Sequence, residues 1–374
     1  MPDCLALVTG GAGLIGSHLA DLLIDQGWRV RILDSLEPQT HGHGKPQWIN
    51  PAAEFVLGDV RDVAMLTSAL NGVDSVFHLA AYGGFMPEIA KFVEVNSLGT
   101  ARLLETIRDR NLPVRKVVIA SSQAVYVEGA VECVTHGVQH PPRRAESAMS
   151  AGNFEVMCPT CGGHTRSVPT PESAPTGGET VYALTKVDQE RLALSWSRQV
   201  GIPAVALRFA CTYGPRQSVF NPYTGVITVF CSRLLNGLGP VLYEDGEQTR
   251  DLCYVSDIAE GCLLAATSDR WDGQAVNIGT GRPTSVRRLA ELLAELLDVR
   301  IRPEIPGAFR PGEMRALIPE IGVALTGGFK PKVGLEEGLA RYIHWLRTQG
   351  PIAERFGESL ERLRRDRVVH PVAS

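Results

Sequence analysis

Short apolar runs alternate with segments of helical period in the first half of the chain. The runs that read as strands occupy residues 5–9, 28–33, 54–57, 75–81 and 116–121. Strands that alternate with helices are typical of parallel sheets joined by right-handed crossovers. The pattern therefore predicts a doubly wound α/β sheet, to which the later runs at 202–208 and 275–278 would add strands.

Residues 129–178 interrupt this alternation. They are rich in Pro, Gly, Thr and Cys and have no sustained period, which is typical of an insertion. We therefore expect one domain over residues 1–208, with an insertion at about 129–178 and a returning strand at about 273–285. A smaller mixed α/β domain would occupy mainly residues 209–374.

Composition and charge narrow the classes of partner. The chain has 374 residues, of which 44% are hydrophobic, and a formal net charge of −4 with both signs mixed. Without a basic stripe, nucleic-acid binding is not expected. No apolar run reaches the ~18 residues of a membrane-spanning helix, so no membrane association is expected. Residues 5–8 lead into glycines rather than a cleavage site, which indicates a strand and a cytoplasmic protein.

A glycine-rich turn follows the first apolar run. Gly10, Gly13 and Gly16 would permit a tight turn, the approach of a pyrophosphate to the backbone, and close packing of a helix whose N-terminal amides face the phosphates. Asp34 ends the next strand, where a carboxylate accepts hydrogen bonds from an adenosine ribose and disfavours a 2′-phosphate. The turn thus predicts NAD; the alternative is an ordinary glycine turn with a solvated Asp. For Asp59, contact with the adenine and a place in an exposed loop are both open.

Tyr182 and Lys186 are four residues apart in a segment of helical pattern, which places both side chains on one helix face. A tyrosine normally titrates near 10 and is a poor base at neutral pH. A nearby ammonium and an oxidised nicotinamide would favour its phenolate. Taken alone, the spacing fits better with a partly buried Tyr and a surface Lys, so the wider pattern must decide.

That wider pattern consists of motifs that follow one another in the order of a known family. They are the turn at 9–16, His78-Leu79-Ala80-Ala81, Asn96 with Gly99-Thr100, Ser121-Ser122 before Val125-Tyr126, and Tyr182 with Lys186. Through them nearly the whole chain resembles the nucleoside-diphosphate-sugar epimerases and dehydratases of the extended short-chain dehydrogenase/reductase superfamily. The resemblance implies a Rossmann-type doubly wound parallel sheet, a smaller substrate domain, and a tightly bound NAD.

The resemblance also implies roles for single residues. Tyr182 would be the base, Lys186 would hold the nicotinamide ribose, and Ser122 would hydrogen-bond the reacting hydroxyl. Arg250 and Arg310 would grip the diphosphate, because a guanidinium binds phosphate in a bidentate manner, although either alone is more often a solvated surface residue. The other cofactor residues would be Gly10, Gly13, Leu14, Ile15, Gly16, Asp34, Asp59, Val60, Ala80, Ala81, Asn96 and Ser121. The substrate residues would be Gly83, Ser122, Gln123, Asn221, Arg250 and Arg310.

Two absences narrow the reaction. The sugar 4,6-dehydratases of this superfamily carry an Asp-Glu pair directly after the Ser or Thr, and the sugar-acid decarboxylases use a Glu at the second position. In this chain the two positions are Gln123 and Ala124, neither of which can act as an acid or base. Reversible hydride transfer fits best, so we expect epimerisation at C4 through a transient 4-keto sugar. A dehydrogenase or reductase that releases NADH remains the alternative, whereas the intact Ser122, Tyr182 and Lys186 argue against a non-catalytic NAD-sensing protein.

The substrate is less narrowly indicated. Residues 33–39 and 213–225 look most like the dTDP-L-rhamnose 4-epimerase branch of the family. Ala210-Cys211 stands where relatives usually have Phe-Asn, and the loop at 82–86 is shorter than usual. Sugars linked to dTDP, UDP or ADP therefore stay open, including UDP-glucuronate and unusual deoxy or heptose sugars. By the same resemblance, helices near 96–108 and 182–199 would pair across a homodimer.

Three of the eight cysteines lie in the insertion and form a metal-ligand pattern. Cys133 and His136 are separated by two residues, as are Cys158 and Cys161. Three thiolates and one imidazole suit tetrahedral Zn²⁺, which would stabilise a segment that lacks a core. The alternative is unpaired cysteines in a surface loop. Because exposed thiols are a liability, we favour a zinc-knuckle-like insertion with a filled, structural site.

Overall fold

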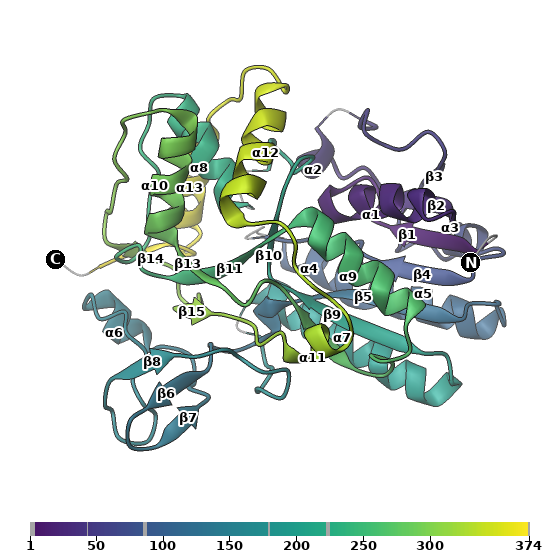
Figure 1. Cartoon of the computed structure of the whole chain (residues 1–374), viewed down its shortest axis with the longest axis horizontal. Helices are drawn as coiled ribbons and strands as arrows, with labels where there is room; N and C mark the ends of the chain where they lie inside the picture. Colours follow the sequence, from purple (N-terminus) through teal and green to yellow (C-terminus); the bar gives the residue numbers. More distant parts are fainter. Residues whose placement is uncertain (1–3, 43, 85–87, 179, 222–224, 373–374) are drawn as a thin grey trace.

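The structure is a computed structural model that describes residues 4–42, 44–84, 88–178, 180–221 and 225–372. Among these residues, seven parallel strands form the central sheet of the larger lobe, in the order β12-β9-β5-β4-β1-β2-β3 (Figure 1). The strands are β1 (Leu5–Thr9), β2 (Arg29–Asp34), β3 (Glu54–Leu57), β4 (Ser75–His78), β5 (Lys116–Ser122), β9 (Ala204–Phe209) and β12 (Ala275–Ile278). The predicted doubly wound sheet is confirmed. Its strand order reverses between β1 and β4, and in such sheets a ligand crevice forms at the carboxyl ends of these strands.

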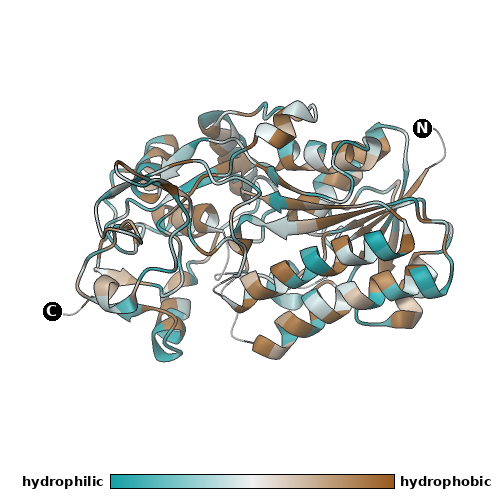
Figure 2. Ribbon diagram, turned by 90° about the horizontal axis from the view of Figure 1, so that it is seen from below, coloured by the Kyte–Doolittle hydropathy of each residue, from teal (hydrophilic) through white to brown (hydrophobic). Residues whose placement is uncertain are grey.

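The two faces of this sheet are covered by separate helical layers. In β1, Ala6 and Val8 pack into the core cluster that contains Leu19 of α1 (Leu14–Asp25) and residues of α9 (Val255–Thr267). Leu5 and Leu7 pack on the opposite face with residues of α3 (Val63–Ala69), α5 (Gly99–Asp109) and α7 (Val181–Val200). Successive side chains of a strand point to opposite faces, so a continuous apolar run is what a sheet covered on both sides requires. Figure 2 shows these apolar strands between the helices.

The helix predicted to begin near Asn96 starts earlier and contains a π turn. It comprises α4 (Ile89–Phe92), η1 (Val93–Leu98) and α5 in direct succession. A π turn inserts an extra residue into the helical repeat and often occurs at functional sites. Here it sets the direction of the Asn96 side chain.

The smaller lobe is built from a second sheet and a group of helices. Its strands are β10 (Cys211–Tyr213), β11 (Thr249–Tyr254), β13 (Pro283–Ser285) and β15 (Ala316–Leu317), and its main helices are α8 (Val226–Leu235), α10 (Val286–Leu297) and α12 (Leu335–Arg347). Their apolar faces form one core around Tyr213, Phe230 and Tyr342. Shorter elements complete the chain: α2 (Pro38–His41), η2 (Gln123–Val125), β14 (Ala308–Phe309), α11 (Gly322–Thr326), α13 (Phe356–Arg365) and β16 (His370–Pro371).

The returning strand is shorter than the predicted 273–285. Only Ala275–Ile278 joins the large sheet, whereas Pro283–Ser285 pairs antiparallel with β11 in the small sheet. The carboxylate of Asp251 accepts hydrogen bonds from the backbone amides of Thr280 and Gly281 at 2.7 Å each, which turns the chain away from the large sheet. The division of the chain at residue 208 remains our proposal.

The insertion forms a small module below the smaller lobe in Figure 1. It contains an antiparallel sheet of β7 (Gly137–Gln139), β6 (Val131–Cys133) and β8 (Thr165–Ser167), together with α6 (Glu146–Ser150). The strands have only three residues each, which is why no alternation was visible in the sequence. In the part of the chain that the structure describes, no helix is both long and apolar enough to span a membrane.

Candidate active site

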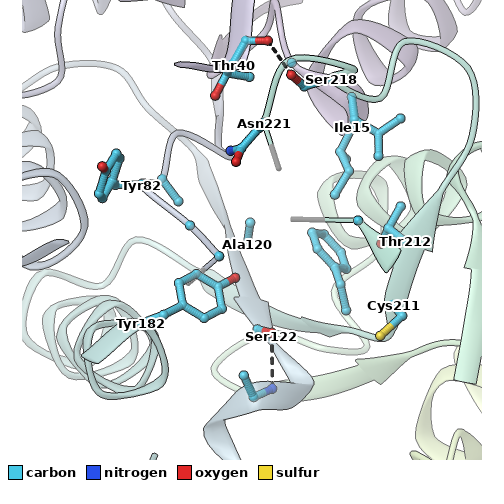
Figure 3. Close-up of a pocket in the computed structure, with 18 of the residues that line it drawn as sticks. Ile15, Thr40, Tyr82, Ala120, Ser122, Tyr182, Cys211, Thr212, Ser218 and Asn221 are labelled. Carbon is cyan, nitrogen blue, oxygen red and sulfur yellow. Dashed lines mark hydrogen bonds between the residues drawn. The ribbon is translucent and has the colours of Figure 1, made fainter. Parts of the chain in front are cut away.

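A cavity of about 730 Å³ lies between the two lobes, within the size range of ligand sites. Every residue that the sequence assigned to the cofactor or the substrate lines this cavity, with the exception of Asn96. The larger lobe contributes the carboxyl ends of β1, β2, β4 and β5 and the start of α7, and the smaller lobe contributes β10, β11 and α8. Figure 3 shows side chains from both lobes around this space.

The glycine turn between β1 and α1 has the geometry of a phosphate cradle. Gly10 has a φ of +69°, and a Cβ there would lie 2.8 Å from the backbone nitrogen of Ala80. A Cβ on Gly16 would lie 2.3 Å from the carbonyl oxygen of Gly10. Gly13 is the N-cap of α1, so no side chain covers the first amides of that helix. The turn can therefore present backbone N–H donors and the positive end of the helix dipole to an anion.

Asp34 is held at the end of β2 by backbone donors. Its carboxylate accepts hydrogen bonds from the amide of Ala12 at 2.9 Å and from that of Leu36 at 2.8 Å. Asp59, in the next loop, pairs with Arg61 at 2.8 Å. The two carboxylates thus line the same end of the cavity, where an adenosine would sit if α1 holds its phosphates.

Trp48 and His41 also line this end, and sequence patterning assigned them no role because residues 35–53 show no period. The indole nitrogen of Trp48 donates to the carbonyl oxygen of Ala12 at 3.0 Å. The imidazole of His41 lies 3.7 Å from the carboxylate of Asp34, and burial lowers the pKa of His41. The segment therefore covers the adenosine end of the cavity.

Tyr182 and Ser122 meet at the opposite end of the crevice. Tyr182 lies in the first turn of α7, which Thr180 caps by accepting a hydrogen bond from the amide of Ala183. Ser122 ends β5, and its hydroxyl also accepts from the amide of Ala124 at 3.1 Å. Figure 3 shows the tyrosine hydroxyl directed toward the serine and the cavity. A Cβ on Gly83 would lie 3.5 Å from the tyrosine ring, at ordinary van der Waals distance, so Gly83 lies directly beside Tyr182.

Lys186 lies one turn after Tyr182 and is only 2% exposed. Its ammonium donates to the carbonyl oxygen of Ala120 at 2.7 Å and lies 5.8 Å from the centre of the Tyr182 ring. Burial lowers the pKa of Lys186 to about 7. The lysine is therefore buried beside the catalytic candidate, in contrast to the surface Lys of the simpler interpretation.

Burial acts in the other direction on the tyrosine. It raises the pKa of Tyr182 above its ordinary value of 10, although a hydrogen bond with Ser122 lowers it and the nearby Cys211 thiol raises it further. The sequence-based expectation was that Lys186 would favour the phenolate. In the protein alone desolvation is the largest influence and the pKa of Tyr182 is raised. Further positive charge in the cavity would lower it.

Gln123 and Cys211 form a contact next to Ser122 and Tyr182. The side-chain amide of Gln123 donates to the Cys211 sulfur at 2.9 Å, and burial raises the pKa of the Cys211 thiol. Cys211 therefore lines the cavity as a neutral thiol where the resemblance predicts an amide. Neither side chain can serve as a general acid or base for elimination.

Two arginines from the smaller lobe share one carboxylate. Arg250 on β11 donates to Glu313 at 3.1 Å, and Arg310 lies 3.8 Å from the other oxygen of Glu313. Arg310 also stacks over the ring of Tyr243 at 4.3 Å. Asn221 lines the cavity and is buried, whereas residues 222–224 of the same motif lie outside the described residues, as do Phe85 and Met86. Glu313 and Tyr243 carried no motif by which the sequence could have identified them.

Asn96 is not among the residues that line the cavity, and its predicted contact with the cofactor stays a prediction. Its side chain accepts from the amide of Tyr82 at 2.7 Å and donates to the Tyr82 carbonyl oxygen and to the Thr185 hydroxyl, each at 2.9 Å. The π turn directs the amide into the space between α7 and the loop that follows β4. Asn96 therefore shapes the wall of the cavity by fixing the backbone at Tyr82.

The four predicted metal ligands come together in the insertion, away from the cavity. The ligand atoms of Cys133, His136, Cys158 and Cys161 all lie within 4.8 Å of one another. The His136 Nδ1 is 3.7 Å from the sulfurs of both Cys133 and Cys158, and the sulfurs of Cys133 and Cys161 are 3.8 Å apart. Ligands about 2.3 Å from a tetrahedral ion are separated by nearly these distances. A disulfide would need sulfurs about 2.05 Å apart.

Comparison with known proteins identifies the family. The chain matches the NAD dependent epimerase/dehydratase family over residues 6–145 and 158–279. It is 31% identical to the dTDP-L-rhamnose 4-epimerase of Burkholderia thailandensis, over 91% of this chain and 94% of that protein. It is 33% identical to a putative UDP-glucose 4-epimerase of Methanocaldococcus jannaschii, over 92% of this chain and 99% of that protein.

Solved structures agree with the sequence relatives. The UDP-glucose 4-epimerase of Thermotoga maritima, solved with UDP-glucose, is 30% identical and superposes with a TM-score of 0.74 over 92% of this chain and 99% of that one. The UDP-glucose 4-epimerase of Thermus thermophilus, solved with NAD, is 28% identical with a TM-score of 0.71 and the same coverage. The family match spans most of the chain and includes the glycine turn and the Tyr182–Lys186 helix. The chain therefore belongs to the NAD dependent epimerase/dehydratase family.

Proposed function

We propose that this protein is an NAD-dependent epimerase that inverts C4 of a nucleoside-diphosphate sugar through a transient 4-keto intermediate. The observation that carries the proposal is the composition of the site around Tyr182. Its hydroxyl and that of Ser122 face the cavity, while the neighbouring Gln123 and Cys211 provide no acid or base. Such a site can move a proton on and off one sugar hydroxyl, but it lacks the groups that eliminate water.

The residues present fit NAD. The cradle at Gly10 and Gly16 admits no Cβ and leaves the amides of α1 open to a pyrophosphate. Asp34 lies where its carboxylate would accept hydrogen bonds from the hydroxyls of a ribose. When bound, NAD would accept the hydride from C4 and return it. The positive charge of the oxidised nicotinamide would also lower the pKa of Tyr182, which burial alone raises.

The chain's own residues would handle the proton. Tyr182, as the phenolate, would accept the proton of the C4 hydroxyl while the C–H bond at C4 breaks, which leaves a 4-keto sugar. Ser122 would hydrogen-bond the same oxygen and hold it near the tyrosine. After the keto sugar has turned over, Tyr182 would return its proton to the C4 oxygen as hydride adds to the other face. Lys186 would hold the nicotinamide ribose, because its ammonium lies one helical turn from Tyr182.

The carboxylates of the cavity support this assignment. Among the described residues, those that line it are Asp34, Glu37, Asp59 and Glu313. The first three belong to the adenosine end, and Glu313 is paired with Arg250. None is therefore available beside Tyr182 for a dehydration.

Contacts between the lobes favour an epimerase over a dehydrogenase that exchanges NADH. Arg216 of the smaller lobe forms an ion pair with Asp21 of α1 at 2.7 Å, and Ser218 donates to the carbonyl oxygen of Thr40 at 2.6 Å. Trp48 packs edge-on against Trp345, with ring centres 6.4 Å apart. These contacts cross the adenosine end of the cavity and would slow the release of the cofactor. An epimerase tolerates slow release because it regenerates NAD in every turnover, whereas a dehydrogenase must exchange NADH.

The diphosphate would lie between the lobes at Arg250 and Arg310. The nucleotide would be dTDP or UDP, as in the names of the dTDP-L-rhamnose 4-epimerase and the putative UDP-glucose 4-epimerase to which the chain is similar. ADP stays open from the sequence. Cys211, where the family pattern has an amide, would alter the contacts to the sugar. We therefore include dTDP-L-rhamnose, UDP-glucuronate and an ADP-heptose among the candidates.

The proposal is tested by following each of these three substrates by proton NMR without added NAD, with absorbance recorded for NADH. We expect one substrate to reach an equilibrium with its C4 epimer while no NADH accumulates. Accumulation of NADH with a keto sugar would instead identify a dehydrogenase, and a 5,6-eliminated or decarboxylated product would rule out the epimerase.

We also propose that the insertion binds a structural Zn²⁺ through Cys133, His136, Cys158 and Cys161. The close approach of the four ligand atoms, three pairs of which are 3.7–3.8 Å apart, supports the proposal. A site with four protein ligands has no open position for catalysis. Metal analysis of protein purified without added zinc should give about one zinc per chain. Substantially less, together with rapid titration of the three thiols of Cys133, Cys158 and Cys161, would contradict it.

Finally, we propose a homodimer formed by the outer faces of α4–η1 and α7. Large apolar side chains are exposed there: Ile89 (64%), Val93 (47%), Leu98 (41%), Leu184 (51%) and Leu192 (38%). These helices pack side by side, so the side chains could form one apolar patch, which often marks a protein interface.

A further inference from the structure

The insertion contacts the substrate end of the cavity through one buried arginine. Both terminal nitrogens of Arg144 donate to the carboxylate of Glu244 at 2.9 Å. One of them also donates to the carbonyl oxygen of Phe154 at 2.9 Å, within the insertion, and the other to the carbonyl oxygen of Glu313 at 2.6 Å. The Nε of Arg144 lies 3.5 Å from Glu128. A single planar guanidinium thus joins the insertion, the smaller lobe and the loop at 310–315.

The loop at 310–315 carries Glu313, whose carboxylate contacts the guanidinium groups of both diphosphate-binding candidates, Arg250 and Arg310. The side chain of Glu313 accepts from Arg250 and faces Arg310, while its backbone carbonyl oxygen is the one that Arg144 holds. A shift of this backbone would move the carboxylate and, with it, both guanidinium groups. Arg144 itself does not line the cavity, so it can act on a ligand only through Glu313.

Arg315 makes a second connection two residues further along the loop. Its backbone amide donates to Glu128 at 2.9 Å, and its guanidinium donates to Glu155 at 2.7 Å and to Asp245 at 2.6 and 2.8 Å. Glu128 and Glu155 belong to the two stretches that enter and cross the insertion. The loop at 310–315 is therefore held from the insertion at both Glu313 and Arg315.

The same two stretches lead directly to the metal-ligand candidates. Cys133 follows Glu128 by five residues along β6, and Cys158 follows Glu155 by three. Among the described residues, those from 131 to 167 belong to none of the buried apolar clusters. An ion bound by Cys133, His136, Cys158 and Cys161 would therefore link the two stretches through side chains, in addition to the backbone pairing of β6 with β8.

We propose that Arg144 is a positioning residue for the sugar nucleotide, and that the metal-bound insertion acts through it to hold the 310–315 loop in its diphosphate-binding geometry. The inference rests on the proposed function in so far as Arg250 and Arg310 bind the diphosphate. It assigns the insertion a role in substrate affinity rather than in the chemical step, because Tyr182, Ser122 and Lys186 receive no hydrogen bond from it among the described residues.

The decisive variant is Arg144→Lys in the full chain with its NAD bound. Lysine keeps the positive charge beside the buried Glu244, but it cannot make the planar set of hydrogen bonds to Glu244, Phe154 and Glu313. Loss of a hydrogen bond that involves a charged group corresponds to a rise in KM of about tenfold or more. We expect this rise for the sugar nucleotide, with kcat within about twofold of wild type and NAD content unchanged. The control is Arg166→Lys, which alters an exposed ion pair with Glu132 on the same module.

Removal of the metal tests the second half of the proposal. Treatment of the holoenzyme with a chelator should raise KM in the same way and should add little to the effect of Arg144→Lys, because both changes act along one path. Cys158→Ser provides an independent route to the metal-free module. Additive effects of chelation and Arg144→Lys, or a KM unaffected by metal loss, would overturn the metal's part.

The outcomes separate this inference from the proposed function. If wild type epimerises a sugar nucleotide and Arg144→Lys leaves its KM unchanged, or lowers kcat and NAD content together, the positioning role is wrong. If wild type turns over no sugar nucleotide, the probe is UDP, with binding measured by calorimetry. A dissociation constant raised about tenfold in Arg144→Lys but not in Arg166→Lys would still support the positioning role, and an unchanged constant would refute it.

Discussion

The ammonium nitrogen of Lys186 lies 2.7 Å from the carbonyl oxygen of Ala120. This contact joins the first turns of α7 to the carboxyl end of β5, and it brings a cation into a space from which solvent is excluded. Burial lowers the pKa of Lys186 from 10.5 to about 7. The lysine is therefore held in place at a cost to stability, as is common for groups of an active site.

Replacement of this lysine should stabilise the protein in a pH-dependent way. Since the pKa of Lys186 is about 7 in the folded chain and near 10.5 in the unfolded chain, the unfolded state binds more protons between these values, and wild-type stability rises with pH across this window. We expect the free energy of unfolding of Lys186→Met at pH 7 to exceed that of wild type by on the order of a few kcal/mol, with a correspondingly higher Tm. The difference should shrink as the pH approaches 10, and a constant difference in Tm from pH 7 to pH 10 would contradict the buried, shifted lysine.

Removal of the tyrosine hydroxyl should abolish turnover without affecting the fold. Tyr182→Phe keeps the ring that packs edge-on against Phe92, with centres 6.3 Å apart, but removes the hydroxyl that we propose as the proton acceptor. We expect kcat to fall by roughly 10²- to 10⁴-fold, with NAD content and Tm close to wild type. Ser122→Ala should lower kcat less, because it removes only a hydrogen bond to the same oxygen. A Tyr182→Phe enzyme with wild-type kcat would exclude Tyr182 as the base.

Cofactor choice should depend on Asp34. Asp34→Asn loses the negative charge and places an amide where two backbone N–H groups now donate. We expect NAD to be retained roughly tenfold less tightly and the preference over NADP to decrease. Measurement of both dissociation constants for the two proteins checks this, with Asp25→Asn in the last turn of α1 as a control for charge. Equal affinity of wild type for NAD and NADP would show that Asp34 does not select the cofactor.

The proposed dimer should depend on the apolar face of α7. Leu184→Glu places a charge in the middle of that face, and burial of an unpaired charge is strongly unfavourable. We expect the variant to be monomeric by light scattering at concentrations where wild type is a dimer. The control is Leu57→Glu, because Leu57 is equally apolar and 61% exposed but lies on β3. A wild-type monomer, or a dimer that Leu184→Glu leaves intact, would rule out this interface.

Local sequence patterns were sufficient to predict those features of the site whose residues are close together in the sequence. The glycines at 10, 13 and 16 lie in one turn, and Tyr182 and Lys186 lie on one helix, as their spacing and context predicted, and both sets line the cavity. The four metal-ligand candidates in the insertion could be predicted only in part. Each x₂-spaced pair is visible locally, whereas the approach of Cys133 to Cys161 depends on the pairing of β6 and β8.

The remaining features depend on contacts between segments that are distant in the sequence. Hydrophobic periodicity describes only local structure, so it does not indicate these contacts. Asn96 lies in a π turn, and its amide bonds the backbone of Tyr82 and the hydroxyl of Thr185, contacts that no local pattern indicates. The pKa of Tyr182 was expected to fall beside Lys186, whereas desolvation raises it. The sequence by itself determined the sheet, the glycine turn and the placement of Tyr182 and Lys186 on one helix face, because these follow from local steric and hydrogen-bonding rules. Only the tertiary structure decided that the Glu313 carboxylate accepts from Arg250 and that its carbonyl oxygen accepts from Arg144. The direction in which burial shifts the pKa of Tyr182 and of Lys186 was also decided there. These features depend on which distant segments pack together and exclude water.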